Sequence, residues 1–186
     1  FSLDYYSETP CKDGEQSPRE RMSLILSFCR RYAENFKKDS PSLLLTGNTG
    51  LGKTHLSLAI AREAIEKGFG VIYTSTQNMI LNMEKEKFKS YYSENESEKL
   101  YTDCDLLIID DLGTEYATAF SSAAIYNVIN SRIMRNKPTI ISTNFSMREL
   151  EKYYTQRMVS RIIGNNIRLE FIGSDVRQKR IKKRNK

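Results

Sequence analysis

A segment about a quarter of the way along the chain has the residue types and spacing of a phosphate-binding loop. It reads GNTGLGKT from Gly47 to Thr54 and fits the pattern G-x-x-x-x-G-K-[ST]. Glycine lets the main chain wrap a phosphate closely, and the free N–H groups at the start of a following helix attract an anion. Lys53 is expected to reach the β- and γ-phosphates of a nucleotide, and the Thr54 hydroxyl to bind Mg²⁺. The alternative is a glycine-rich turn without a ligand, but a chance match in a chain of this length is on the order of one in a hundred.

The predicted cofactors are therefore ATP and Mg²⁺. We expect nucleotide contacts from the whole loop and from the residue after it, namely Gly47, Asn48, Thr49, Gly50, Leu51, Gly52, Lys53, Thr54 and His55. His55 is the only histidine of the chain, and a lone histidine in the first turn of a helix is expected to serve packing and not catalysis.

A second motif, LLIIDDLG from Leu106 to Gly113, is an apolar run that ends in two carboxylates. Asp110 is placed to hold the Mg²⁺ shell, usually through water, and Asp111 to orient or deprotonate the attacking water. The alternative is a buried strand followed by an acidic turn. A phosphate-binding loop upstream at suitable spacing favours the catalytic interpretation.

A third candidate is Asn144, which ends the segment ISTN. It could reach between the acidic strand and the γ-phosphate and help to position water. The alternative is a turn asparagine before the next helix, and only the presence of the other two motifs favours the functional interpretation.

The elements that would position these residues alternate between strand and helix. Apolar runs predict strands at 43–46, 71–74, 106–109, 139–142 and 167–172, and helical periodicity predicts helices at 17–36, 53–67, 77–92, 120–134 and 146–163. Residues 93–99 form a charged loop or a helix start, and Ser146 with Glu149 is a candidate capping box. The strands lack polar alternation, which predicts a parallel sheet buried on both faces between helices. The strand at 71–74, between the two motifs, should set the acidic strand beside the phosphate-loop strand. That layout argues for an ATPase and against an adenylate-kinase-like nucleotide kinase.

Length and composition limit the remaining classes. A chain of 186 residues is enough for one domain, and no apolar run approaches the roughly 20 residues that span a bilayer, so we expect no membrane association. Cys11, Cys29 and Cys104 lack metal-ligand spacing and are expected to be free thiols in a reducing cytoplasm. The start at Phe1, without Met or a signal peptide, suggests a fragment.

The charge is concentrated at the C-terminus. The whole chain has a net charge of +6. Seven of its 29 lysines and arginines lie in the last ten residues, RQKRIKKRNK, and the remainder of the chain is close to neutral. Such a tail can contact nucleic-acid phosphates, or it can be a solvated end. We expect an N-terminal linker and helix over 1–40, an ATPase domain over 41–173 and a basic tail over 174–186.

The segments GNTGLGKTH, LLIIDDLGTE, PTIISTN and QRMVSRIIG together resemble the AAA+ ATPase domain of bacterial helicase loaders of the DnaC/DnaI type, to which the transposition helper IstB is related. The resemblance extends from about Phe1 through Arg177. It implies an α/β P-loop fold with a five-stranded parallel sheet of order 5-1-4-3-2. With only a short segment after Gly173, no full helical lid is expected.

The resemblance also implies further roles for single residues. Asn144 is similar to the sensor 1 residue, Arg161 to an arginine finger that acts on ATP held by a neighbouring subunit, and Arg177 to the sensor 2 arginine. Many AAA+ proteins have Asp-Glu where this chain has Asp110-Asp111, so slow hydrolysis is expected. The loaders also have an N-terminal helicase-binding domain, which we expect a fragment that begins at Phe1 not to include.

The implied function is ATP-dependent loading of the replicative helicase onto single-stranded DNA, with self-association through ATP sites at subunit interfaces. The helix at 77–92, with Lys85, Lys87, Phe88 and Lys89, is a candidate DNA-facing element, although a solvated amphipathic helix would have the same pattern. The alternatives are an IstB-like transposition helper and a nucleotide-gated binding module with negligible turnover.

Overall fold

The computed structural model of the chain describes residues 1–10, 16–89 and 96–178, and it describes the side chains of these residues except Phe88 and Lys89. Its sheet has five parallel strands in the order β2 (Val71–Ser75), β3 (Leu106–Leu112), β4 (Thr139–Thr143), β1 (Ser42–Thr46) and β5 (Asn166–Glu170). The predicted order 5-1-4-3-2 is confirmed. The prediction that the acidic strand lies beside the phosphate-loop strand was wrong, because β4 pairs with both β3 and β1 and separates them.

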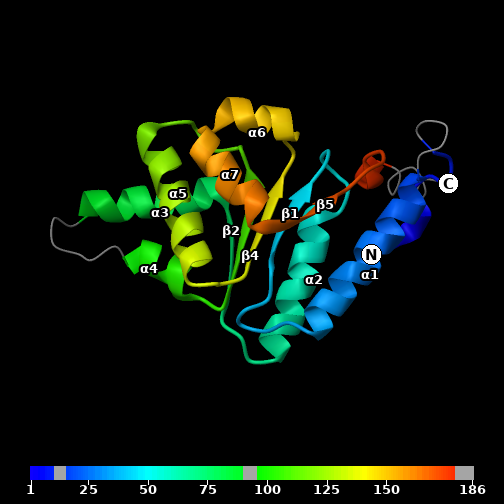
Figure 1. Ribbon diagram of the computed structural model, residues 1–186, viewed down its shortest axis with the longest axis horizontal. Coiled ribbons are helices and arrows are strands. Elements are labelled where there is room, and N and C mark those ends of the chain that lie inside the picture. Colours follow the sequence, from blue (N-terminus) through cyan, green and yellow to red (C-terminus); the bar gives the residue numbers. More distant parts are fainter. Residues whose placement is uncertain (11–15, 90–95, 179–186) are drawn as a thin grey trace.

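Helices cover both faces of this sheet, and Figure 1 shows α1 and α2 on one side and α3, α5 and α7 on the other. Successive strand residues alternate between two apolar cores: Leu43 and Leu45 join the core under α1 and α2, whereas Leu44 joins the opposite core. The bounds are η1 (Leu3–Tyr5), α1 (Pro18–Glu34), α2 (Lys53–Glu66), α3 (Thr76–Lys89), α4 (Glu96–Asp103), α5 (Ala119–Met134), α6 (Met147–Tyr153) and α7 (Gln156–Gly164).

Burial on both faces holds for the middle of the sheet only. Strands β1, β3 and β4 are almost fully buried, whereas in the edge strand β5 the side chains of Ile167, Arg168 and Glu170 are exposed. An edge strand has a sheet neighbour on one side only, and helices leave its outer part open. The expectation that all five strands are buried was therefore wrong at the edges.

The predicted helix at 146–163 is two helices, which is a third correction. The capping box of Ser146 and Glu149 is present and starts α6. At Tyr154 the backbone is extended, and the hydroxyl of Thr155 then accepts a hydrogen bond from the N–H of Met158 and caps α7. The Tyr154 side chain is buried, with its hydroxyl bonded to the carboxylate of Glu115, so a tertiary contact ends the first helix.

The remaining predicted elements lie close to their expected bounds. Strand β3 continues through the acidic pair to Leu112 and has an irregular register between Ile109 and Leu112. Helix α4 starts at Glu96, inside the predicted charged segment, and residues 90–95 are outside the described part. Cys29 and Cys104 are free thiols, whereas Cys11 is outside the described residues.

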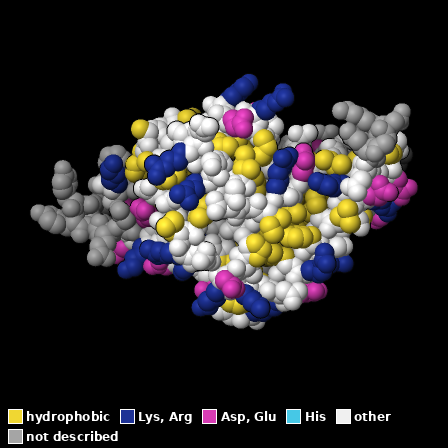
Figure 2. Space-filling view, viewed as in Figure 1, with side chains coloured by type: hydrophobic (Ala, Val, Ile, Leu, Met, Phe, Trp, Pro, Cys, Tyr) yellow, Lys and Arg dark blue, Asp and Glu magenta, His cyan; other side chains and the backbone are white. Residues whose placement is uncertain are grey.

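The surface of the described part agrees with a nearly neutral body. On the face shown in Figure 2, Lys and Arg side chains are spread among acidic and hydrophobic ones and do not gather in one patch. Within residues 1–10, 16–89 and 96–178, no helix has the length and hydrophobicity needed to cross a bilayer.

Candidate nucleotide-binding site

The phosphate-binding loop joins the end of β1 to the start of α2, as the sequence predicts. Its three glycines have positive φ angles of 125° at Gly47, 74° at Gly50 and 89° at Gly52. A Cβ atom at Gly47 would lie 2.2 Å from the carbonyl oxygen of Phe171, and one at Gly50 would lie 2.0 Å from the Asp175 carboxylate. Gly52 caps α2 without a side-chain hydrogen bond, so the first N–H groups of α2 are available to an anion.

Lys53 is buried at 5% exposure. Its ammonium donates hydrogen bonds to the carbonyl oxygens of Gly47 at 2.5 Å and Asn48 at 2.8 Å, and to Oδ1 of Asn144 at 2.7 Å. These three acceptors compensate for the loss of water around the charge. Burial lowers the pKa of the Lys53 ammonium, and the nearby carboxylates of Asp111 and Asp110 oppose this shift.

Asp110 is buried at 4% exposure and accepts hydrogen bonds from three hydroxyl groups. Thr54 donates at 2.9 Å to Oδ2 and Tyr73 donates at 2.7 Å to the same oxygen, while Ser142 donates to Oδ1. The three donors come from α2, β2 and β4, which surround the end of β3. The structure thus brings together the two predicted metal residues, Thr54 and Asp110, and adds Tyr73 and Ser142, which sequence reasoning missed.

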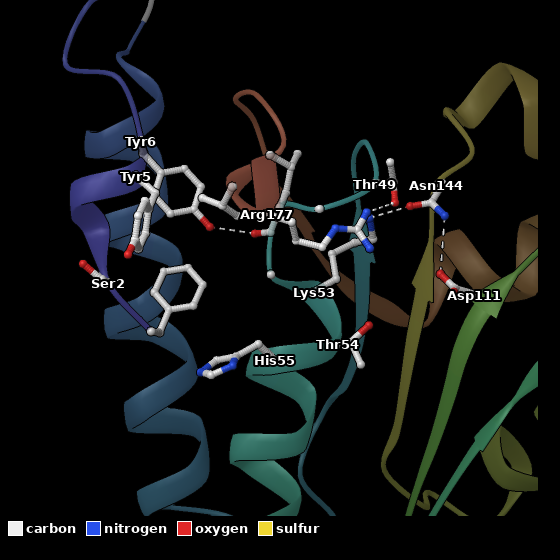
Figure 3. Close-up of a pocket in the computed structure, with 15 residues that line it drawn as sticks. Ser2, Tyr5, Tyr6, Thr49, Lys53, Thr54, His55, Asp111, Asn144 and Arg177 are labelled. Carbon is white, nitrogen blue, oxygen red and sulfur yellow. Dashed lines mark hydrogen bonds between the residues drawn. The ribbon is translucent and has the colours of Figure 1, made fainter. Parts of the chain in front are cut away.

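Asp111 follows in a left-handed backbone conformation with φ of 55°. Its N–H donates to the hydroxyl of Ser142 at 3.0 Å, and its carboxylate accepts from Nδ2 of Asn144 at 3.4 Å. Burial raises the pKa of the Asp111 carboxyl, and the charge of Asp110 raises it further. Asn144 therefore links Lys53 to Asp111, which Figure 3 shows at the edge of the cavity.

Glu115, the next acid along the chain, does not face this cavity. It is 4% exposed, and its carboxylate accepts hydrogen bonds from the Tyr154 hydroxyl and, at 3.0 Å, from the N–H of Gly113. These contacts tie the loop after β3 to the junction of α6 and α7. Glu115 therefore connects two segments of the fold, whereas Asp111 lines the cavity.

The cavity itself has a volume of about 610 Å³ and is lined on one side by the phosphate-binding loop, Asp111 and Asn144. Its other side is an aromatic wall of Phe1, Tyr5 and Tyr6, which sequence reasoning assigned to a linker. Figure 3 shows Tyr5 and Tyr6 across the cavity from Asn144 and Asp111. The rings of Phe1 and Tyr6 stack with centroids 5.7 Å apart, and the Tyr6 hydroxyl donates to the carbonyl of Leu51 at 2.8 Å. The three aromatic residues within FSLDYY were the available sequence signal.

His55 lies on the exposed side of α2 and also lines this cavity. Its ring contacts that of Phe1 with centroids 5.9 Å apart. It therefore packs, as expected, but at the rim of the cavity and not in a core.

Arg177 lies beside the phosphate-binding loop, although it is far from the loop in sequence. Its guanidinium donates to the Thr49 hydroxyl at 2.8 Å and pairs with Asp175 at 3.3 Å. The N–H of Val176 also donates to the carbonyl of Gly50 at 3.0 Å. The predicted sensor 2 residue thus lines the cavity, while residues 179–186 of the basic tail are outside the described part.

Arg161 is separate from this group of residues. It is half-buried in the last turn of α7 and does not line the cavity. Within the described residues, no ion pair joins Arg161 to an acid of its own chain.

The residues of the site fit a magnesium ion of the kind that binds with a nucleotide. In the described part of the chain, no three His, Cys, Asp or Glu side chains converge to hold a metal by themselves. Mg²⁺ commonly uses one or two protein oxygens and takes its other ligands from phosphates and water. The hydroxyl of Thr54, supported by Asp110, provides such a partial set.

Comparison with known proteins agrees with this geometry. The family described as IstB-like ATP binding protein matches residues 31–183. The replicative helicase loader DnaC of Escherichia coli K12 is 29% identical over 143 residues, which is 76% of this chain and 58% of that protein. AMPPCP-bound DnaA from Aquifex aeolicus is 26% identical with a TM-score of 0.74, covering 89% of this chain and 51% of that one. A DnaC helicase loader structure, at 24% identity and a TM-score of 0.74, shares the fold over 92% of this chain and 96% of its own. The chain therefore belongs to the family of IstB-like ATP-binding proteins and is an AAA+ P-loop ATPase domain of the DnaC type.

Proposed function

We propose that the chain binds Mg–ATP in the cavity beside Lys53 and hydrolyses it slowly as the ATPase domain of a replicative helicase loader. The observation that carries this proposal is the connected set of Lys53, Asn144 and Asp111, which lies across the cavity from the aromatic wall. A volume of about 610 Å³ is within the usual range of ligand pockets. The DnaC relatives support the loader role, although the chain spans only 58% of the length of the first of them.

In this proposal the nucleotide base packs on the rings of Phe1 and Tyr6, and the phosphates lie over the N-terminus of α2. Lys53 exchanges its bonds to the loop carbonyls and to Asn144 for bonds to phosphate oxygens. The Thr54 hydroxyl, supported by Asp110, would hold Mg²⁺, which would supply positive charge that offsets the charge of the phosphates.

In the chemical step of this proposal, Asp111 and Asn144 act on the attacking water. The Asn144 amide, no longer bonded to Lys53, orients the attacking water, and the carboxylate of Asp111 accepts its proton. The raised pKa of Asp111 makes its carboxylate a stronger base than a solvated aspartate. Arg161 of one subunit would stabilise charge on the γ-phosphate of the next, and Arg177 would contact the same nucleotide from the C-terminal side.

The proposed partners are the replicative helicase, single-stranded DNA and further copies of the chain, in the cytoplasm. For DNA, the exposed Lys85 of α3 supports the proposed contact, whereas Lys87 lies 5.0 Å from the centre of the Phe120 ring and is already engaged. The side chains of Phe88 and Lys89 are outside the described part.

A second candidate is an IstB-like transposition helper, because the matching family is described by that protein. The third is a nucleotide-gated module with negligible turnover. Measuring ATP affinity and steady-state hydrolysis with no DNA, single-stranded DNA and duplex DNA separates the three. Stimulation by single strands supports the loader, stimulation by duplex alone supports the helper, and tight binding without turnover supports the gated module. A Lys53→Met variant is the control, and equal Mg–ATP affinity in it and the natural chain would refute the site.

A further inference from the structure

Tyr73 is an exposed residue whose hydroxyl is bonded to a buried carboxylate. It lies in the edge strand β2 with 44% of its surface exposed, and its hydroxyl donates at 2.7 Å to Oδ2 of Asp110. A phenol at a sheet edge could bond to water instead. Here the hydroxyl is bonded to an acid that is only 4% exposed.

With this contact, three hydroxyl groups donate hydrogen bonds to the Asp110 carboxylate. A carboxylate has about four acceptor positions on its two oxygens. Oδ2 accepts from Tyr73 and Thr54, while Oδ1 accepts from Ser142 and, more weakly at 3.3 Å, from Thr54. Since Tyr73 and Ser142 come from the strands on either side of β3, the carboxylate is held from both sides.

The carboxylate of Asp110 decides how the Thr54 hydroxyl is oriented. An ionised carboxylate can only accept, so the Thr54 hydroxyl must give its proton to Asp110. The lone pairs of the Thr54 oxygen then point away from Asp110, and Thr54 also lines the cavity. Asp110 therefore acts on a metal shell by fixing this hydroxyl, and Tyr73 and Ser142 fix Asp110.

We propose that Tyr73 is a positioning residue for magnesium binding, acting through Asp110 on the Thr54 hydroxyl. This rests on the proposed function, because it requires Mg²⁺ to bind with ATP beside Thr54. Residues that orient a metal-binding group in this way typically change metal affinity 10- to 100-fold when they are substituted. Tyr73 acts through two hydrogen bonds in series, so the lower end of that range, about 10-fold, is expected.

The test is Tyr73→Phe, which removes one oxygen and keeps the ring. Affinity for a fluorescent ATP analogue is measured with saturating Mg²⁺ and with EDTA, and Mn²⁺ binding to the nucleotide complex is followed by electron paramagnetic resonance. We expect the same affinity in EDTA as in the natural chain, and about 10-fold weaker binding of the divalent ion. The matched control is Tyr32→Phe, because the Tyr32 hydroxyl donates at 2.8 Å to the carbonyl of Pro41, away from the cavity.

Three outcomes overturn the inference. An unchanged divalent-ion affinity in Tyr73→Phe shows that the hydroxyl does not position Asp110 for the ion. An equal loss of affinity for the ATP analogue in EDTA and in Mg²⁺ shows that the hydroxyl supports the local structure and not the binding of the ion. If the natural chain binds the analogue without any effect of Mg²⁺, the proposed Mg–ATP site fails and the inference fails with it.

Discussion

Replacing Asp111 by Asn separates its role in hydrolysis from its role in the fold. Asp111 has a φ of 55°, a conformation that Asn adopts more readily than other non-glycine residues. Its backbone N–H still donates to Ser142, and the new amide oxygen still accepts from Asn144. Asp111→Ala is the matched variant, and it should cost about 1 kcal/mol more because Ala has no polar side chain to support the left-handed conformation.

The expected rate effect is large and the binding effect is small. General base catalysis contributes about 10²- to 10⁴-fold, so ATP hydrolysis by Asp111→Asn should fall by that factor. Lys53, Thr54 and Asp110 are unchanged, and one negative charge beside the γ-phosphate is removed. ATP affinity should therefore be retained or increased.

The effect on stability has a sign that depends on pH. Because the pKa of folded Asp111 lies above 3.8, the folded state disfavours the ionised form. Neutral Asp111 makes its full contribution to the free energy of unfolding below pH 3.8, and the natural chain loses this contribution as pH rises through the raised pKa. Asp111→Asn, which stays neutral, should thus melt at a higher temperature than the natural chain at pH 7, and the difference should shrink toward pH 4.

The assay is single-turnover hydrolysis, equilibrium ATP binding and thermal melting between pH 4 and pH 8 on the natural chain and both variants. Hydrolysis by Asp111→Asn at the natural rate would refute Asp111 as the base. A lower melting temperature than that of the natural chain at pH 7 would refute the electrostatic part of the reasoning.

Three further substitutions test other parts of the site. Lys53→Met should reduce ATP affinity by at least about 10-fold, yet change the free energy of unfolding in urea by less than about 2 kcal/mol, because lost hydrogen bonds and a removed buried charge offset each other. Arg161→Ala should bind ATP normally and hydrolyse it up to about 10³-fold more slowly, and mixing it with Lys53→Met protein should restore turnover; no recovery in co-assembled protein would count against a finger in trans. Glu115→Gln should hydrolyse ATP at close to the natural rate but lose about 1–3 kcal/mol in denaturant unfolding, since Tyr154 and Gly113 lose a charged acceptor; abolished hydrolysis in a folded protein would make Glu115 the base.

Much of the site was predictable because its residues belong to short motifs in which they lie close together in sequence. The glycines from Gly47 to Gly52 have the positive φ angles expected of such a loop, and the loop lies between a strand and a helix as predicted. The apolar run before Asp110 forms a central strand, and Asp110 lies beside Thr54 at the end of the phosphate-binding loop. The strand order followed from resemblance, since spacing alone placed the acidic strand wrongly beside β1.

Contacts between distant segments were decided by the tertiary structure. Tyr6 of the aromatic wall contacts Leu51 of the phosphate-binding loop, which is 45 residues away in sequence. The break between α6 and α7 occurs because buried Tyr154 bonds to Glu115, which overrides a continuous helical pattern.

The tertiary structure also decides the environment of the charged groups. Lys53 is identified by its place in the loop, but its burial depends on Asn144, 91 residues later. Asp110 is identified by the strand that precedes it, but its orientation depends on hydroxyls from two neighbouring strands, Tyr73 and Ser142. A sequence pattern specifies which groups a short segment presents, through periodicity and backbone preference. Which donors surround a carboxylate depends on the side chains that strand pairing and helix packing bring within about 3 Å of it, and these come from segments that are far apart along the chain.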